Sequence, residues 1–118
     1  VAGVMSNAET EIHNQILCEL SRAYHPRGMF WRQNAGRVCT QSGAWVTLGP
    51  PVIADIVGSL DGRAVFVEVK RPGERQRKSQ KNFQAAAERA GALYVVARSP
   101  EEAIEAVRPK ARDKRSRS

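Results

Sequence analysis

The sequence is poor in cysteine and contains no long apolar run. Cys18 and Cys39 form no CxxC or other metal-binding spacing, which favours a reduced, cytosolic setting over a disulfide scaffold. No apolar stretch approaches the roughly 18 residues that a membrane span requires, and residues 1–8 lack the pattern of a secretion signal. We therefore expect no membrane association and no secretion. The expected location is the cytoplasm of a bacterial or phage-infected cell, or the nucleus of a eukaryote.

Length and charge divide the chain into a body and a tail. With 118 residues, one domain is expected. Of the net charge of +7, +5 belongs to residues 108–118, where six residues are basic and one is acidic. Such a tail suits a polyanion, and a solubilising or added end explains it equally well. We expect residues 1–8 to be a leader or an added segment, residues 9–107 to form the folded domain and residues 108–118 to be a basic, disordered tail.

Hydrophobic periodicity and turn residues predict an α/β fold. A capping pattern, Ser6-x-x-Glu9, opens a helix that should end before His25-Pro26. Residues 58–62 should form a hairpin connection around Asp61-Gly62. A helix between the last two strands predicts a crossover joining parallel neighbours in a mixed sheet. Strands are expected at 29–34, 38–40, 45–48, 52–57, 63–70 and 93–97, and later helices at 79–90 and from Ser99 onwards.

Three charged residues stand inside apolar strands. Glu68 and Lys70 share one face of their strand because side chains alternate, and Asp55 lies on the strand connected to it. Cross-strand neighbours lie about 5 Å apart, and two carboxylates at that distance repel each other unless a cation lies between them. Hard oxygen ligands favour Mg²⁺ or Mn²⁺ over zinc. Lys70 is then placed to hold a water or to stabilise charge on a phosphate, although an arbitrary Glu-x-Lys pair is more often a solvated strand face.

Several short motifs extend this pattern and carry a family resemblance. The motifs are Glu9-Thr-Glu-Ile12, Trp31-Arg-Gln-Asn34-Ala-Gly36, Asp55-Ile-Val-Gly58, Gly62-Arg63, Glu68-Val-Lys70-Arg-Pro-Gly73 and Gln80-Lys-Asn-Phe83. With them the chain resembles the virus-type replication-repair nuclease (VRR-NUC) branch of the PD-(D/E)XK nuclease superfamily. The proline that usually precedes the aspartate is missing. The resemblance implies a restriction-endonuclease-like mixed β-sheet flanked by helices, with an α-β-β-β-α-β core and an extra C-terminal helix.

The resemblance also implies roles for individual residues. Asp55, Glu68 and a glutamate of the first helix would be metal ligands for Mg²⁺, and Lys70 and Gln80 would complete the catalytic set. The alternative interpretation is that Gln80 is an ordinary surface amide of its helix.

Two residues compete for the place of the first-helix glutamate. Glu9 shares the inward stripe of Ile12 and Ile16, whereas Glu11 is turned by about 100° from Ile12 and should face solvent. We favour Glu9, which also has a rival role as the partner of Ser6 in the capping pattern.

Further residues are candidates for nucleic-acid binding. Asn34 is either a turn residue or a substrate contact. The loop and helix that follow the Lys70 strand are basic, and we favour phosphate contacts over a solvated loop because they leave directly from the presumed site. The basic residues are Arg71, Arg75, Arg77, Lys78 and Lys81.

Two tryptophans and two histidines are predicted to lie outside the catalytic and metal-binding set. Trp31 and Trp45 are expected to be core or dimer contacts rather than base-stacking platforms. His13 and His25 have no partner at ligand spacing, so we expect them to be structural or exposed.

The main expectation is a Mg²⁺-dependent DNA endonuclease for repair-type substrates such as four-way (Holliday) junctions or flaps. The resemblance implies a homodimer, which would supply two active sites for two strands. Two alternatives remain: a nucleic-acid-binding module on the same fold without turnover, and a sequence-specific restriction-type endonuclease, for which the small domain leaves little room for a base-reading element.

Overall fold

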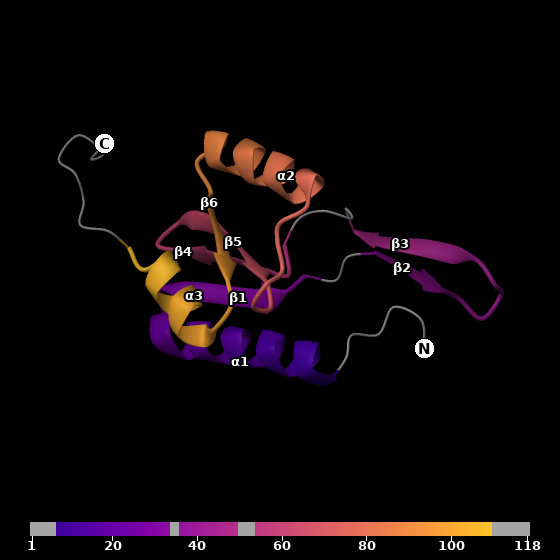
Figure 1. The fold of residues 1–118 in the computed structure, drawn as a ribbon, viewed down its shortest axis with the longest axis horizontal. Coiled ribbons are helices and arrows are strands. Elements are labelled where there is room, and N and C mark those ends of the chain that lie inside the picture. The colour runs from indigo at the N-terminus through magenta and orange to yellow at the C-terminus, as the bar shows by residue number, and fades with distance from the viewer. Residues whose placement is uncertain (1–6, 34–35, 50–53, 110–118) are drawn as a thin grey trace.

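The computed structural model describes residues 7–33, 36–49 and 54–109 (Figure 1). None of the helices in these ranges is long and apolar enough to cross a membrane. The predicted order of helices and strands is confirmed. The elements are α1 Asn7–Tyr24, β1 Gly28–Arg32, β2 Gly36–Cys39, β3 Trp45–Gly49, β4 Ile56–Leu60, β5 Arg63–Val69, α2 Lys78–Arg89, β6 Leu93–Ala97 and α3 Pro100–Val107.

Helix α1 ends where the sequence predicts. Its last residue is Tyr24, directly before the His25-Pro26 pair. Ile16 and Leu20, four residues apart, are completely buried, so the predicted inward stripe is confirmed. The Tyr24 hydroxyl donates a 2.6 Å hydrogen bond to the Ile104 carbonyl oxygen and so joins α1 to α3. Ser6, the expected capping residue, lies outside the described residues.

The central sheet has four strands in the order β1-β4-β5-β6. β1, β4 and β5 are antiparallel neighbours, and β6 runs parallel to β5 after the crossover through α2, as predicted. Ile56 pairs with Val67, and Glu68 pairs with Val96. The register therefore puts the Glu68 end of β5 in the middle of the sheet, flanked by neighbouring strands.

The prediction for residues 58–62 is wrong in extent. β4 continues through Gly58 and Ser59 to Leu60, and only Asp61 and Gly62 form the turn. Both turn residues have positive φ, 52° and 82°, which the Asp-Gly pair tolerates and a two-residue hairpin requires. Gly58 lies within the strand, and the position requires glycine because a Cβ there would overlap the Met29 carbonyl oxygen. Glycine thus marks a close approach of two strands rather than a turn.

The sheet separates two helical layers. α1 and α3 cover one face and α2 covers part of the other (Figure 1). The main core lies between the sheet and the α1–α3 layer, and it includes Ile16, Leu20, Ile56, Val65, Val67 and Val107. On the other face the Phe83 ring of α2 packs edge-on against Phe66, with centroids 5.2 Å apart. A mixed α/β fold with helices on both faces of the sheet is therefore established.

The strands β2 and β3 form a separate two-stranded sheet that we call the arm, residues 36–49. Its strands are antiparallel, with Cys39 opposite Trp45 and Val38 opposite Val46. Figure 1 shows the arm extending away from the body, which the helices and the four-stranded sheet form. Trp31 and Trp45 were predicted to be core or dimer contacts. Both are exposed, so the core alternative is wrong, and the dimer alternative stays a prediction.

Candidate active site

The end of β5 carries two buried charged side chains. Val65, Val67 and Val69 face the main core, so alternation turns Glu68 towards the α2 side of the sheet. Glu68 is only 2% exposed, and Lys70 is buried as well. Burying an ionised group away from water is costly unless it is paired or binds a ligand. The solvated-face reading of Glu68 and Lys70 is therefore wrong.

Asp55 is joined directly to this strand end. It stands immediately before β4 rather than inside a strand, and its carbonyl oxygen accepts a 2.9 Å hydrogen bond from the Gln33 amide. Its carboxylate oxygen Oδ2 accepts a 2.7 Å hydrogen bond from the amide of Val69. Since Val69 lies between Glu68 and Lys70, the three predicted residues meet at one place in the fold.

The environment of Glu68 makes its ionisation unfavourable. Burial raises the pKa of the Glu68 carboxyl, and the negative charge of Asp55 raises it further. The ammonium group of Lys70 opposes this rise in pKa, as do the polar side chains of Tyr94 and Gln76. Even so, Oε2 of Glu68 and the Tyr94 hydroxyl are buried without a hydrogen-bond partner of normal geometry in the described part of the chain. An oxygen atom in this state could accept a bond from a cation or from another donor.

Burial also raises the pKa of Tyr94, and the charge of Glu68 adds to the rise. Tyr94 follows Leu93 on β6 and lies on the same face of the sheet as Phe66, its partner in the register. Neither Tyr94 nor Gln76 stands out in the sequence as a site residue. Gln76 lies in the loop before α2, and no spacing rule relates it to Glu68.

His13 is a second feature that spacing did not reveal. It is buried on α1, with Nε2 3.9 Å from Oδ2 of Asp55 and Nδ1 3.4 Å from a guanidinium nitrogen of Arg32. An arginine can only donate, so this contact favours the tautomer whose proton is on Nε2, facing Asp55. The signal in the sequence is weak, because a histidine that follows Ile12 on an amphipathic helix cannot be told from a structural one. The contact depends on how α1 packs against the sheet.

Of the three predicted metal ligands, the structure describes the side chains of two, Asp55 and Glu68. Asp55 and Glu68 supply the hard oxygens that Mg²⁺ and Mn²⁺ prefer. Among the side chains that the structure describes, no three His, Cys, Asp or Glu groups gather closely enough to hold an ion. Glu9 belongs to α1, but its side chain is outside the described part of the chain; Glu11 is exposed, as predicted.

Gln80 has a definite structural partner. Its Oε1 accepts a 2.7 Å hydrogen bond from the Arg77 amide, so it caps the first turn of α2. The structure brings Gln76, rather than Gln80, into electrostatic contact with Glu68. Asn34, the other polar candidate, lies outside the described residues.

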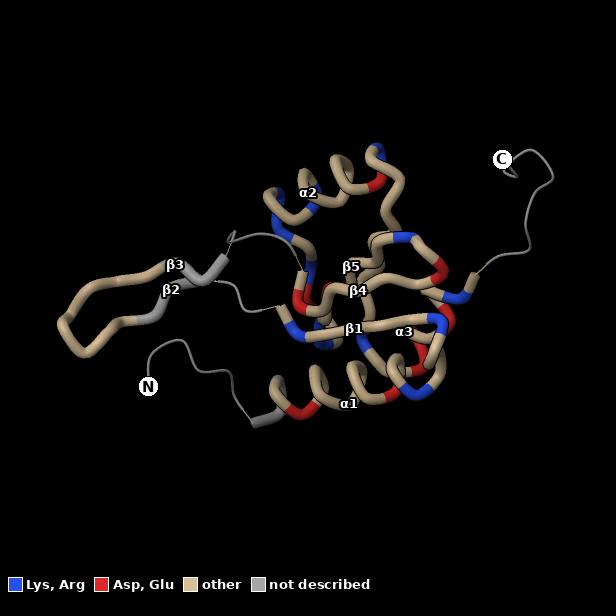
Figure 2. Tube along the Cα trace, turned by 180° about the vertical axis from the view of Figure 1, so that it is seen from behind, with Lys and Arg blue, Asp and Glu red and all other residues tan. Residues whose placement is uncertain are grey.

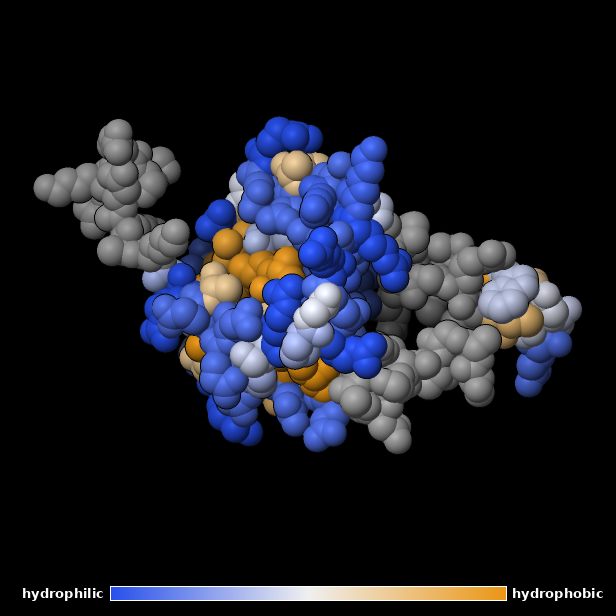
Figure 3. All heavy atoms as spheres, in the orientation of Figure 1, coloured by the Kyte–Doolittle hydropathy of each residue, from blue (hydrophilic) through white to orange (hydrophobic). Residues whose placement is uncertain are grey.

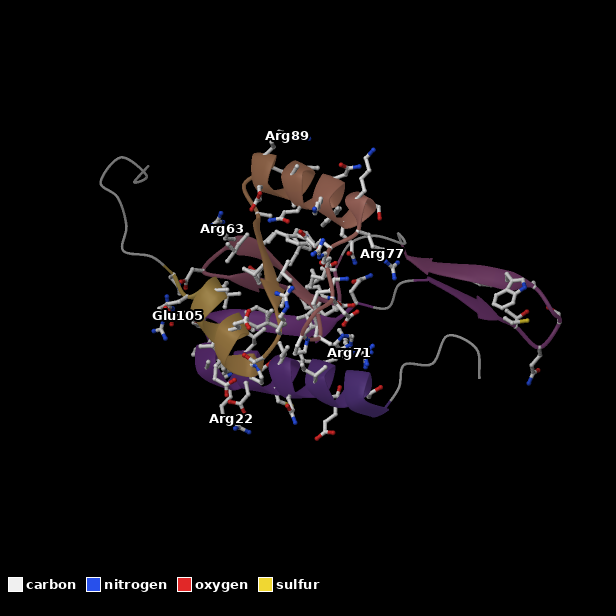
Figure 4. The ribbon with its side chains drawn as sticks, viewed as in Figure 1. Arg22, Arg63, Arg71, Arg77, Arg89 and Glu105 are labelled. Carbon is white, nitrogen blue, oxygen red and sulfur yellow. The ribbon has the colours of Figure 1, made fainter. Side chains whose placement is uncertain are left out.

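The loop between β5 and α2 is organised and basic. Glu74 accepts a 2.6 Å hydrogen bond from the Arg71 amide, and Arg98 donates a 2.9 Å bond to the Glu74 carbonyl oxygen. Figure 4 shows Arg71 and Arg77 on the side of the body from which the arm extends, and Figure 2 shows basic residues along this segment. Of the other predicted phosphate contacts, two lie in the first turn of α2, Lys78 and Lys81. Arg75 precedes them in the loop.

Comparison with known proteins supplies no relative. No family model matches the chain, and no curated protein or solved structure matches it significantly.

Proposed function

We propose that this protein is a metal-dependent DNA endonuclease on a restriction-endonuclease-like fold, of the virus-type replication-repair nuclease kind. The observation that carries the proposal is the buried Glu68 carboxyl, which lies beside Lys70 and Asp55. Among the described residues, its Oε2 has no hydrogen-bond partner of normal geometry. A fold gains no stability from such a group, because an unsatisfied buried charge costs free energy. A ligand that it binds would explain its presence at the end of the central strand.

The site residues would have different roles in phosphodiester hydrolysis. Asp55 and Glu68 would hold Mg²⁺, and Mn²⁺ would substitute for it. When bound, the ion polarises a phosphoryl oxygen and makes a coordinated water more acidic. Lys70 orients a water or stabilises the negative charge that develops on the phosphate during hydrolysis. His13, with Nε2 3.9 Å from Oδ2 of Asp55, would help to position that carboxylate, and Tyr94 and Gln76 border the Glu68 carboxyl.

The substrate is inferred from the charges around this site. Arg75, Lys78 and Lys81 belong to the segment that leaves the Lys70 strand, and we propose that they contact phosphates. Phosphate contacts position a duplex without reading its sequence, which suits an enzyme that recognises DNA structure. Four-way junctions and flaps are the proposed substrates, as the resemblance implies.

The test is cleavage of a four-way junction, a flap and a linear duplex of shared sequence in Mg²⁺, Mn²⁺ and a chelator. We expect Mg²⁺-dependent cleavage of the branched substrates. Glu68→Gln and Lys70→Ala should each reduce the cleavage rate by about 100-fold or more, a loss typical of electrostatic catalytic groups, while DNA binding remains measurable. Glu88→Gln, which changes an exposed carboxylate of α2, is the matched control and should cleave normally.

Three results would count against the proposal. Full cleavage by Glu68→Gln would remove the assigned site, and cleavage in excess chelator would remove the metal. Tight DNA binding by the wild-type protein with no cleavage in any divalent metal would instead identify a binding module.

A further inference from the structure

One row of side chains crosses the face of the central sheet that carries Glu68. Each strand contributes one residue to this row, which we call the ledge, in the order Trp31, Val57, Phe66 and Tyr94. At one end Tyr94 is buried beside the Glu68 carboxyl, and at the other end Trp31 is 46% exposed. The ledge therefore leads from an exposed indole ring to the candidate active site.

The orientation of Trp31 follows from its neighbour in β1. Phe30 packs against Tyr24 of α1 on the core side, so alternation along the strand turns Trp31 to the α2 side of the sheet. On that side the Phe83 ring of α2 contacts the ledge at β5 and β6. The β1 end of the ledge is the part that the described helices leave exposed.

The exposed end of the ledge is close to Asp55. The Gln33 amide donates a 2.9 Å hydrogen bond to the Asp55 carbonyl oxygen, so the pairing of β1 with β4 continues one step beyond Arg32. Asp55 is then a diagonal neighbour of Trp31 across the two strands, and such neighbours lie roughly 7–8 Å apart. Successive phosphates of one DNA strand are spaced by about 3.4 Å along the helix axis. A strand held beside Asp55 would therefore bring a nearby base to the indole ring.

The charge around the ledge suits nucleic acid. Figure 3 shows mostly hydrophilic residues over α2, and Figure 4 shows Arg77 at the beginning of this helix and Arg89 at its other end. The exposed basic residues at the beginning of α2 and in the loop before it are Arg75, Arg77, Lys78 and Lys81. A basic segment beside an exposed aromatic ring is the combination that binds unpaired nucleic acid strands. An apolar protein surface would have no use for the basic residues.

We propose that the Trp31 indole stacks on an unpaired nucleobase at the branch point of the DNA, next to the phosphate that is cleaved. This inference rests on the proposed function and names the feature of the substrate that the site selects. A base inside a duplex must first be extruded, at a free-energy cost that is smallest for a base that is already unpaired. Trp31 therefore favours branched over linear DNA, whatever the sequence, because every base has a π face. This role differs from the core or dimer contact that the sequence favours for Trp31.

The test compares the wild-type protein with Trp31→Leu and Trp31→Phe for binding to a flap and to a linear duplex of shared sequence. The flap carries the fluorescent base aminopurine at its unpaired branch position, where stacking on an aromatic ring lowers the emission. Binding is measured in excess chelator, so that no metal-dependent cleavage intervenes. Met29→Ala is the matched control, because Met29 is also exposed on this face of β1 but lies further from Asp55.

The expected results separate stacking from apolar packing. Trp31→Leu should bind the flap about 5- to 100-fold more weakly, as expected for the loss of one stacked base, and should no longer lower the aminopurine emission. Its affinity for the linear duplex should stay at the wild-type value. Trp31→Phe keeps an aromatic ring and should retain most of the affinity for the flap and most of the fall in emission. Met29→Ala should bind both DNA molecules as the wild type does.

Several results would overturn the stacking role. These are an unchanged affinity of Trp31→Leu for the flap, an equal loss of affinity for flap and duplex, and equal affinities of the Leu and Phe variants. A change in the solution mass of Trp31→Leu would assign Trp31 to a protein interface and would also overturn it. Circular dichroism establishes that the variants are folded. If Trp31→Leu does not fold, the wild-type protein decides, since an aminopurine emission that stays constant on binding the flap would refute stacking.

Failure of this inference is distinguishable from failure of the proposed function. Mg²⁺-dependent cleavage together with wild-type flap binding by Trp31→Leu would refute the stacking role alone. A wild-type protein that binds the flap with the expected fall in emission, but cleaves no DNA in any divalent metal, would refute the nuclease and leave the stacking role in place.

Discussion

The carboxylate of Asp55, just before the start of β4, accepts a 2.7 Å hydrogen bond from the amide of Val69 at the end of the neighbouring strand β5. This bond gives Asp55 two separable roles. One oxygen fixes the end of β5 between Glu68 and Lys70, and the negative charge contributes to the site. Substitutions that keep the acceptor but remove the charge can separate the two roles.

Asp55→Ala should destabilise the protein by about 1–3 kcal/mol, because the partly buried Val69 amide loses its acceptor. Asp55→Asn retains an oxygen that can accept this bond, so its free energy of unfolding should stay closer to that of the wild type. Both variants should lose Mg²⁺-dependent cleavage. Urea unfolding measures the stabilities, and equal stability of the Ala and wild-type proteins would contradict the structural role of the bond.

Glu68→Gln should stabilise the metal-free protein at neutral and alkaline pH. Because burial raises the folded-state pKa of Glu68, its favourable contribution is complete below the unfolded pKa and is lost as pH rises through the folded pKa. The gain from removing the charge should therefore be small at pH 4 and about 1 kcal/mol at pH 8, which corresponds to several degrees in Tm. Thermal unfolding at both pH values measures it. A gain confined to pH 4 would reverse the assigned direction.

His13→Ala should weaken Mg²⁺-dependent cleavage by about 10- to 100-fold, the usual effect of losing a group that orients a metal ligand. The Mg²⁺ concentration at half-maximal activity should rise, because Oδ2 of Asp55 loses the neighbour at 3.9 Å. His25→Ala, at an exposed position just after α1, is the control. If the two variants respond equally to Mg²⁺, His13 has no part in holding Asp55.

The two glutamines near α2 should differ in what they control. Gln80→Ala removes the acceptor of the Arg77 amide and should cost about 1 kcal/mol of stability. Gln76→Ala should affect cleavage more than stability, because Gln76 opposes the rise in the pKa of Glu68 and otherwise donates one 3.0 Å hydrogen bond, to the Gln84 side chain. Comparing cleavage with the urea midpoint for each variant checks this contrast. A large catalytic loss in Gln80→Ala at unchanged stability would restore Gln80 to the catalytic set.

Single replacements of Arg75, Lys78 or Lys81 by alanine should weaken DNA binding on all substrates alike. Each should also reduce the slope of log affinity against log salt concentration by about 1, as expected for one lost phosphate contact. Arg89→Ala, at the opposite end of α2 (Figure 4), is the matched control. An unchanged salt slope in all three variants would show that this segment lies away from the DNA.

Local rules were sufficient for much of the fold. Pro26 set the end of α1, Asp61-Gly62 set the hairpin turn, and alternation along β5 put Glu68 and Lys70 on one face. The error at Gly58 has a physical reason, since the same absence of a side chain serves a turn or a close strand contact. Only the position of β1 distinguishes the two cases.

The residues around the site were less predictable than the site itself. Asp55, Glu68 and Lys70 stand out because charge is unusual in apolar strands. His13, Tyr94 and Gln76 join them through the packing of α1, β6 and a loop, which no periodicity encodes. Trp31 and Trp45 failed as core predictions because hydrophobicity indicates burial without telling whether the same chain provides it.

The body should be unusually sensitive to substitution of Gly58, a residue that carries no charge and no side chain. A methyl group at this position would press on the Met29 carbonyl oxygen and on the Phe30 ring, and β1 would have to move outwards. Arg32 and Gln33, further along the same segment, contact His13 and Asp55 and would be carried with it. The clearance between two backbones thus sets where Asp55 lies, and an alanine scan would find an inactive protein at a residue that has no functional group.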